Sequence, residues 1–330
     1  MNLWLCLEEN MRTLLDKRDT YCLKGIAMLM IIIGHTFNGY PVESSNVYYP
    51  QWLNGLHIEH WGGMGVAIFF LLSGYGLFTS LSRRKGIDKR YVAQKGRRLF
   101  VPYILYWIVE VIVLLFFSRE ELSTHLFTEM ATFEIHPDLE NWFFKVIVFV
   151  YIIMLLLFRW HLRNSVRVTV ISFLSVLYLI TMKALGYGEW WWNTILCFPL
   201  GVFIAYKYDT FAKLPARWML LSIGLLLVVC YYFHVNTIVF YLLCCMFSIY
   251  ALRLINIQNC ILYYIGFNSL IFYFIECPVM DNIMMFSYSC FPEYCALSVV
   301  GTFAISYLCV TITNICSFII SRNKVWLFKH

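Results

Sequence analysis

The chain has 330 residues, of which 61% are hydrophobic and only 13% are charged. A soluble domain carries about 25% charged residues, so the composition excludes an ordinary soluble enzyme and indicates a protein embedded in a membrane. The formal net charge of +6 does not indicate nucleic-acid binding, because basic residues of membrane proteins collect on their cytoplasmic side.

Ten apolar segments, each near the length of about 20 residues that crosses a bilayer as a helix, follow one another along the chain. They lie at about 23–40, 64–82, 101–117, 141–158, 166–182, 190–206, 217–234, 237–254, 261–280 and 295–320. We expect an amphipathic cytoplasmic lead-in over residues 1–22, a single transmembrane domain over residues 23–320 and a cytoplasmic tail over residues 321–330. The predicted fold class is therefore an all-α membrane protein, a polytopic bundle of about ten transmembrane helices in contact with membrane lipids.

The Lys and Arg residues are distributed unevenly over the connections between these segments. Of the 25 residues, 22 lie in alternate connections, and the opposite connections carry acidic residues instead. Basic residues mark the cytoplasmic side of a membrane protein, so both termini are expected in the cytoplasm. The expected location is the cell membrane, plasma or inner, which the chain crosses several times.

The first apolar segment begins with a basic residue, Lys24, and carries a histidine, His35, eleven residues later with no ionisable residue between them. On a helix, eleven residues make three turns plus about 20°, which puts both side chains on one face roughly 16 Å apart. A histidine at that depth is costly unless it faces protein, water or substrate, so His35 is a functional candidate. The alternative is a buried histidine that is hydrogen-bonded to a neighbouring helix.

The connection over residues 41–63 is predicted to lie on the outer side and is rich in aromatic rings. It contains Tyr48, Tyr49, Pro50, Trp52, His57, His60 and Trp61. Flat rings with polar tips can stack on the faces of sugars, which favours a saccharide as a partner. The alternative is an ordinary aromatic belt at the membrane interface.

The second apolar segment contains two polar residues, Ser73 and Tyr75, and the basic stretch, residues 83–98, follows it. Eight Lys and Arg residues lie in the basic stretch, three of them at its end: Lys95, Arg97 and Arg98. A basic cytoplasmic loop can fix the orientation of the chain and bind anionic lipid head groups, or it can bind a phosphorylated cofactor. Ser73 and Tyr75 are either packing residues between helices or hydrogen-bond donors to a substrate.

Three further charged residues lie in or beside apolar segments: Glu110, Lys145 and Glu276. A carboxylate that faces lipid costs several kcal/mol, so Glu110 and Glu276 should both point inward. Each is therefore a candidate for contact with the substrate. The sequence leaves open which of the two orients His35 and which pairs with Lys145.

No metal site and no nucleotide-hydrolysis site are predicted from the sequence. The 12 cysteines are scattered without a C-x-x-C pair, and His57 and His60 have no accompanying ligand set. The chain has no P-loop and no dinucleotide-binding glycine motif in a suitable context. We therefore expect no metal cofactor.

Six short motifs stand in order along the chain. They are Lys24-Gly-Ile-Ala followed by His35, Phe69-Phe-Leu-Leu-Ser-Gly-Tyr75, Arg97-Arg98-Leu-Phe-Val-Pro-Tyr103, Asn141-Trp-Phe-Phe, Phe198-Pro-Leu-Gly201 and Ile265-Gly-Phe-Asn-Ser-Leu-Ile-Phe-Tyr273. Together they resemble the membrane-bound acyltransferase 3 family over about residues 20–280. The family's basic-x10-His pattern falls on Lys24 and His35, and its basic-x-x-Arg pattern falls on Lys95 and Arg98.

The chain departs from the family's pattern at four places. Lys24 and Lys95 stand where the family commonly has arginine, and lysine lacks the bidentate fork with which arginine holds phosphate. Tyr21 stands where an acidic residue often precedes the first basic position. Glu276-Cys-Pro278 stands at the end of the ninth segment, where many members have a histidine before a proline.

The resemblance implies transfer of an acyl group from cytoplasmic acyl-CoA to a hydroxyl of a cell-envelope glycan or a lipid-linked saccharide. Acetyl is the expected acyl group, so acetyl-CoA is the expected donor substrate. The resemblance also implies that His35 is the general base or, in a second scheme, the carrier of the acyl group. Lys24 would then guide the thioester arm towards His35.

The remaining candidates take supporting roles in the same reaction. Lys95, Arg97 and Arg98 would hold the phosphates of CoA at the cytoplasmic side. Ser73 and Tyr75 would donate hydrogen bonds to the oxyanion that develops on the thioester carbonyl.

Two other classes of protein share many of these features. Ten spans with intramembrane charges also describe a proton-coupled transporter or a lipid-linked sugar flippase, although the chain lacks the two corresponding halves that many transporters have. A non-catalytic member that only holds a glycan-assembly complex together is the third possibility. An alanine in place of His35 distinguishes them, because only an acyltransferase loses acylated product while it still inserts normally.

Overall fold

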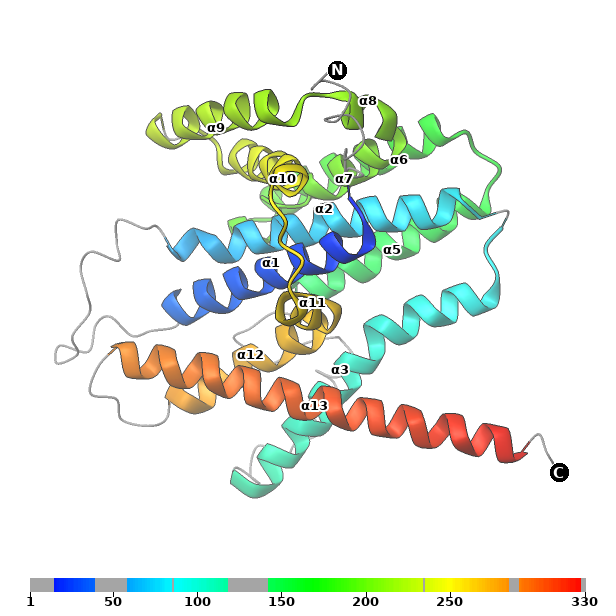
Figure 1. The fold of residues 1–330 in the computed structure, drawn as a ribbon, viewed down its shortest axis with the longest axis vertical. Coiled ribbons are helices and arrows are strands. Elements are labelled where there is room, and N and C mark those ends of the chain that lie inside the picture. Colours follow the sequence, from blue (N-terminus) through cyan, green and yellow to red (C-terminus); the bar gives the residue numbers. More distant parts are fainter. Residues whose placement is uncertain are drawn as a thin grey trace, which may run out of the picture. The chain divides into compact units, whose positions relative to one another are not determined.

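The computed structural model describes residues 15–38, 58–84, 86–117, 142–233, 235–284 and 291–327 (Figure 1). These residues form twelve α-helices and two short 3-10 helices, and they contain no β-strand. The predicted all-α fold is confirmed. Two predicted outer segments lie outside the described residues: the aromatic run from Tyr48 to His57 and the connection at 118–140.

The helices follow the predicted segments closely at most places. They are α1 (Lys17–Asn38), α2 (Trp61–Ser82), α3 (Lys89–Phe117), α5 (Trp142–Arg159), α6 (Asn164–Ala184), α7 (Cys197–Tyr206), α8 (Tyr208–Lys213), α9 (Ala216–Tyr232), α10 (Thr237–Leu254), α11 (Cys260–Phe267), α12 (Ser269–Met284) and α13 (Phe291–Leu327). Short 3-10 helices lie at Ile58–His60 and Glu189–Trp191. Helix α1 begins inside the predicted lead-in, so residues 17–22 continue directly into the first span.

Six of the described helices are long and apolar enough to cross a membrane: α1, α2, α5, α6, α10 and the Glu293–Ile315 part of α13. If α11 and α12 are counted as one span, the number is seven. Helices α7 and α9 are apolar but shorter, with 10 and 17 residues. The chain is therefore a multi-pass membrane protein, and the count of ten spans stays a prediction.

The ninth predicted segment is not one continuous helix. Helix α11 ends at Phe267, and the carbonyl of Asn268 accepts the first backbone hydrogen bonds of α12, from Ile271 at 2.8 Å and Phe272 at 3.3 Å. Asparagine is typical of the position that begins a helix. The sequence prediction missed this break because hydropathy alone does not detect it.

Contacts divide the chain into two compact units, of which the first contains residues 1–31, 60–93 and 141–267. At its centre, α2 packs against α7, α5 and α10. A Cβ atom at Gly74 would overlap the carbonyl of Phe198, and one at Gly201 would overlap the carbonyl of Leu71. The backbones of α2 and α7 therefore touch, and only glycine fits at both positions.

The first part of α1 crosses α11 in the same way within this unit. A Cβ atom at Gly266 would overlap the carbonyl of Tyr21, and one at Gly25 would overlap the carbonyl of Leu262. The ring of Tyr21 also packs on Tyr263, with 5.2 Å between ring centroids. These contacts fix the segment of α1 that carries Lys24.

The second unit contains residues 32–59, 94–140 and 268–330, which include the end of α1, most of α3, and helices α12 and α13. Helix α12 packs against α13, where the rings of Phe272 and Phe303 lie 5.3 Å apart. Tyr103 and Tyr106 of α3 cover Phe274 of α12, at 5.7 and 6.1 Å between ring centroids. Aromatic packing on two sides therefore fixes the middle of α12.

Candidate functional site

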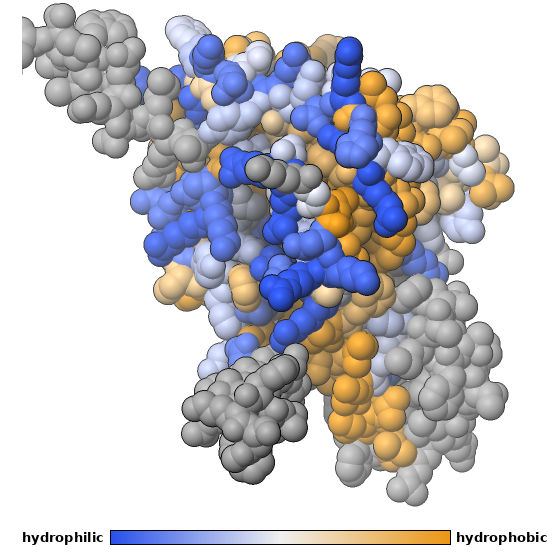
Figure 2. Space-filling view, turned by 90° about the vertical axis from the view of Figure 1, so that its right-hand side faces the viewer, coloured by the Kyte–Doolittle hydropathy of each residue, from blue (hydrophilic) through white to orange (hydrophobic). Residues whose placement is uncertain are grey.

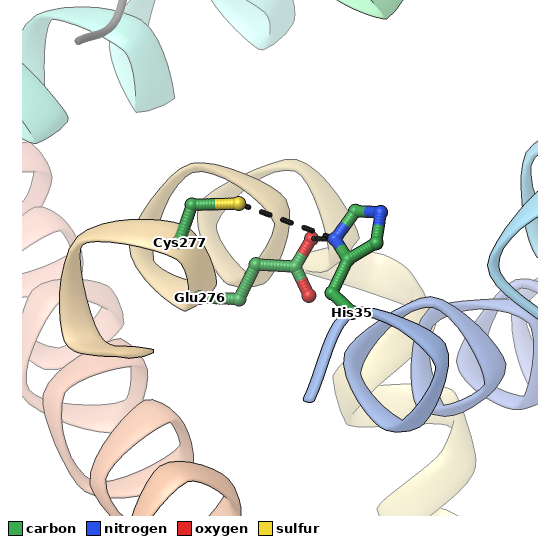
Figure 3. A group of neighbouring side chains, drawn as sticks. All are labelled: His35, Glu276 and Cys277. Carbon is green, nitrogen blue, oxygen red and sulfur yellow. Dashed lines mark hydrogen bonds and ion pairs between the residues drawn. The ribbon is translucent and has the colours of Figure 1, made fainter. Parts of the chain in front are cut away.

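The end of α1 brings His35 against Glu276 of α12, 241 residues further along the chain (Figure 3). The Nδ1 atom of His35 lies 3.1 Å from Oε1 of Glu276, which is a hydrogen-bonding distance. Both residues belong to the second unit. Of the two carboxylates that the sequence offered as partners for His35, the structure places Glu276 against the ring.

A second contact between α1 and α12 lies beside this pair. The hydroxyl of Thr36 donates a hydrogen bond to the carbonyl of Ile32 at 2.7 Å and contacts Sδ of Met280 at 3.4 Å. Thr36 is buried, and Met280 lies one helical turn beyond Glu276. Two adjacent residues of α1 therefore contact consecutive turns of α12, which fixes the position of the His35 ring on Glu276.

The two partners differ in exposure. The side chain of Glu276 is 0% exposed, whereas that of His35 is 35% exposed. In Figure 3, Nδ1 points towards the carboxylate and the second ring nitrogen, Nε2, points away from it. When Nδ1 carries the proton that Glu276 accepts, Nε2 keeps a free electron pair and can accept a proton from another group.

The second carboxylate oxygen of Glu276, Oε2, is buried and has no hydrogen-bond partner among the described residues. A carboxylate buried in a membrane protein is costly, so the hydrogen bond from His35 is important for holding it there. The same bond orients the imidazole. The geometry is that of a base whose tautomer is set by a buried carboxylate.

Cys277, next to Glu276, also lies near the ring, with its Sγ atom 4.0 Å from Nδ1 of His35 (Figure 3). Cys277 is a residue of the site that was not predicted, since in the sequence it stands only within a departure from the family's pattern. One ligand atom from each of His35, Glu276 and Cys277 lies within 4.8 Å of the other two, a spacing that a metal ion would also accept. The 3.1 Å hydrogen bond explains the His35–Glu276 contact with one proton, so the absence of a metal stays our prediction.

Metal chelators test this prediction directly. We expect EDTA and 1,10-phenanthroline to leave the turnover of the solubilised protein unchanged, because a proton rather than a metal joins the two side chains. The measurement is the initial rate before and after chelation. Loss of activity that zinc restores would show instead that the three residues bind a metal.

The structure places the basic candidates on α3. Arg97 and Arg98 are exposed and Lys95 is half-buried, all three within the second unit. In the first unit, basic residues stand at two helix ends. Arg83 directly follows α2, and Arg159 is the last residue of α5. Figure 2 faces the ends of α2 and α5 and shows hydrophilic side chains on this side of the first unit. The charges of Arg97 and Arg98 thus lie at the surface of α3.

The other predicted site residues are divided between the two units. Lys24 lies half-buried in the part of α1 that belongs to the first unit, as do Ser73 and Tyr75, which are each 8% exposed on α2. Burial between helices agrees with the packing interpretation of Ser73 and Tyr75. Glu110 is half-buried on α3 in the second unit.

The model of one protein family, described as an acyltransferase domain, matches residues 21–312 of the chain. This match covers nearly all of the helices, including both α1 with His35 and α12 with Glu276.

The chain belongs to the acyltransferase 3 family. It is a multi-pass membrane acyltransferase. The searches of curated proteins and of solved structures found no match. In this acyltransferase, the partly exposed ring of His35 and the buried carboxylate of Glu276 lie within hydrogen-bonding distance.

Proposed function

We propose that this acyltransferase moves an acyl group, with acetyl the expected one, from cytoplasmic acyl-CoA to a hydroxyl of a cell-envelope glycan or a lipid-linked saccharide. The observation that carries the proposal is the hydrogen bond between Nδ1 of His35 and the buried carboxylate of Glu276. It leaves Nε2 of a partly exposed imidazole as a proton acceptor. Transfer of an acyl group to a hydroxyl requires a base of this kind.

The proposed reaction proceeds in one displacement. Nε2 of His35 removes the proton from the acceptor hydroxyl. The oxygen of that hydroxyl attacks the thioester carbonyl at the same time, so a C–O bond forms. The C–S bond then breaks, and the sulfur of CoA leaves with the proton that His35 returns to it. Glu276 stabilises the imidazolium that exists between the two proton transfers.

In the second scheme, Nε2 itself attacks the thioester and carries the acyl group before the acceptor takes it. A single-turnover experiment without acceptor separates the two schemes. An acyl-histidine intermediate gives a burst of free CoA equal to the amount of protein, and direct transfer gives no burst.

We further propose that Lys95, Arg97 and Arg98 bind the phosphates of acyl-CoA at the cytoplasmic side, and that Lys24 guides its thioester arm. The exposure of Arg97 and Arg98 supports this role. The uneven distribution of Lys and Arg supports a cell-membrane protein with both termini in the cytoplasm.

Loss of two of these charges should weaken donor binding. We expect Lys95→Ala combined with Arg98→Ala to raise the KM for acetyl-CoA about tenfold or more, because charge-assisted hydrogen bonds to phosphate are lost. The kcat should change little. Arg159→Ala combined with Arg163→Ala is the matched control, since it removes two exposed charges at another helix end. An unchanged KM in the first variant would remove this assignment.

Mass spectrometry of envelope glycans tests the proposed function in cells. Cells that contain the intact gene should carry acylated saccharides that are missing when the gene is deleted and return when it is restored. Unchanged glycans, together with a lost solute flux in cells without an acyl donor, would instead favour a transporter.

A further inference from the structure

Three side chains of metal-binding type converge at the His35–Glu276 contact. One ligand atom from each of His35, Glu276 and Cys277 lies within 4.8 Å of the other two (Figure 3). Nδ1 of His35 lies 3.1 Å from Oε1 of Glu276 and 4.0 Å from Sγ of Cys277. All three residues belong to the second unit. The cluster thus offers an imidazole nitrogen, a carboxylate oxygen and a sulfur atom to a single ligand.

The separations in this cluster are close to those around a tetrahedral zinc ion. Zinc bonds of about 2.0–2.3 Å to nitrogen, oxygen and sulfur put neighbouring ligand atoms about 3.4–3.6 Å apart. The two measured distances, 3.1 and 4.0 Å, lie on either side of this range. Small side-chain rotations therefore suffice to bring the three atoms around one ion, with the fourth position of the tetrahedron left to water.

The charges of the cluster favour a divalent cation. Glu276 is 0% exposed, and its Oε2 atom has no hydrogen-bond partner among the described residues. One carboxylate and one thiolate balance the two charges of Zn²⁺, so the occupied cluster is neutral, which lowers the cost of burying it in a membrane. Sulfur and imidazole ligands also favour zinc over magnesium and calcium, which bind to oxygen.

The cluster is accessible on the side of the imidazole ring. The side chain of His35 is 35% exposed and Cys277 is half-buried, whereas Glu276 is fully buried. An ion can therefore reach the cluster from the surface that exposes the ring.

We propose that His35, Glu276 and Cys277 form an inhibitory site for Zn²⁺. When the ion binds, the thiol of Cys277 gives its proton to water, and the ring proton of His35 moves from Nδ1 to Nε2. Zinc thereby replaces the hydrogen bond to Glu276. Nε2 then carries a hydrogen and has no free electron pair with which to accept the proton of an acceptor hydroxyl. The inhibition rests on the proposed function, and turnover without zinc still needs no metal.

Zinc titrations of the whole chain in detergent test the site. The readouts are zinc bound in equilibrium dialysis and the initial rate of acyl transfer, expressed relative to the zinc-free rate of the same variant. We expect Zn²⁺ to inhibit the wild type and Mg²⁺ to have no effect. In Cys277→Ser, the zinc concentration that halves the rate should rise about a hundredfold or more, because even an outer partner of a metal ligand is worth about 10–100-fold in affinity.

Two further sets of variants complete the titration. Cys260→Ser is the matched control, since it removes an exposed thiol of the first unit, and it should bind zinc and be inhibited like the wild type. His35→Ala and Glu276→Gln should each lose the bound ion in dialysis, a readout that does not depend on their activity.

Equal inhibition of the wild type and Cys277→Ser, or an equal amount of zinc bound to both, would overturn the assignment. If Cys277→Ser does not fold, alkylation of the wild type makes the same test. Zinc should protect Cys277 from N-ethylmaleimide and leave Cys260 unprotected, and equal alkylation of Cys277 with and without zinc would overturn the site. Failure of the proposed function looks different, since the wild type would then bind zinc at Cys277 but transfer no acyl group even without zinc.

Discussion

Replacing His35 with alanine lowers acyl transfer by about 10²–10⁴-fold, the usual contribution of a general base, while the protein inserts and accumulates as before. The change removes the only ring that Glu276 orients in the described site. It also removes Nε2, which accepts the proton of the acceptor hydroxyl in direct transfer and the acyl group in the second scheme. The measurement is the amount of acylated glycan in cells that produce equal amounts of each variant.

The matched control for this prediction is His161→Ala. His161 is exposed, follows the end of α5 and belongs to the first unit. We expect it to retain full activity. Full activity in the His35→Ala variant would show that this ring is a structural histidine and that the reaction uses other residues.

Replacing Glu276 with glutamine lowers kcat about a hundredfold or more and leaves the KM for acetyl-CoA nearly unchanged. The amide is neutral, so it stabilises the imidazolium less than a carboxylate does. It can also donate to Nδ1 of His35, which would move the ring proton to Nε2 and abolish the free electron pair there. Glu276→Asp should retain part of the activity, since it keeps the charge on a shorter side chain.

A fall in kcat with an unchanged KM shows that Glu276 orients the ring of His35. A purely structural role of Glu276 would not give this split. Glu189→Gln removes an exposed carboxylate and serves as the neutral control. Glu110→Gln tests the other carboxylate that the sequence offered, and its effect should be smaller than that of Glu276→Gln. An equal loss in both carboxylate variants, or a loss confined to protein abundance, would contradict the role of Glu276 in positioning His35.

Much of the candidate site was predictable from single positions. His35 stands alone in a long apolar segment, so its cost in a membrane marked it as a functional candidate. The same reasoning required Glu110 and Glu276 to face inward. The choice of Glu276 needed the structure, because the sequence contains no record of which helices meet across 241 residues.

The fold shows the same division. Runs of apolar residues predicted an all-α membrane protein and placed most helices within a few residues of their observed bounds. They could not reveal the break at Asn268, because the residues on both sides of it are equally apolar. Close backbone contacts at Gly74 and Gly201 were also invisible, since a glycine in a span does not identify the carbonyl against which it packs.

The most direct test is transfer of label from radioactive acetyl-CoA in inverted membrane vesicles that contain the protein and its native glycans. Vesicles with the wild-type chain should move label into the glycan fraction, and vesicles with His35→Ala or without the protein should not. If the wild-type vesicles leave all label on CoA, or if His35→Ala transfers it equally well, acyl transfer through the His35–Glu276 pair is contradicted.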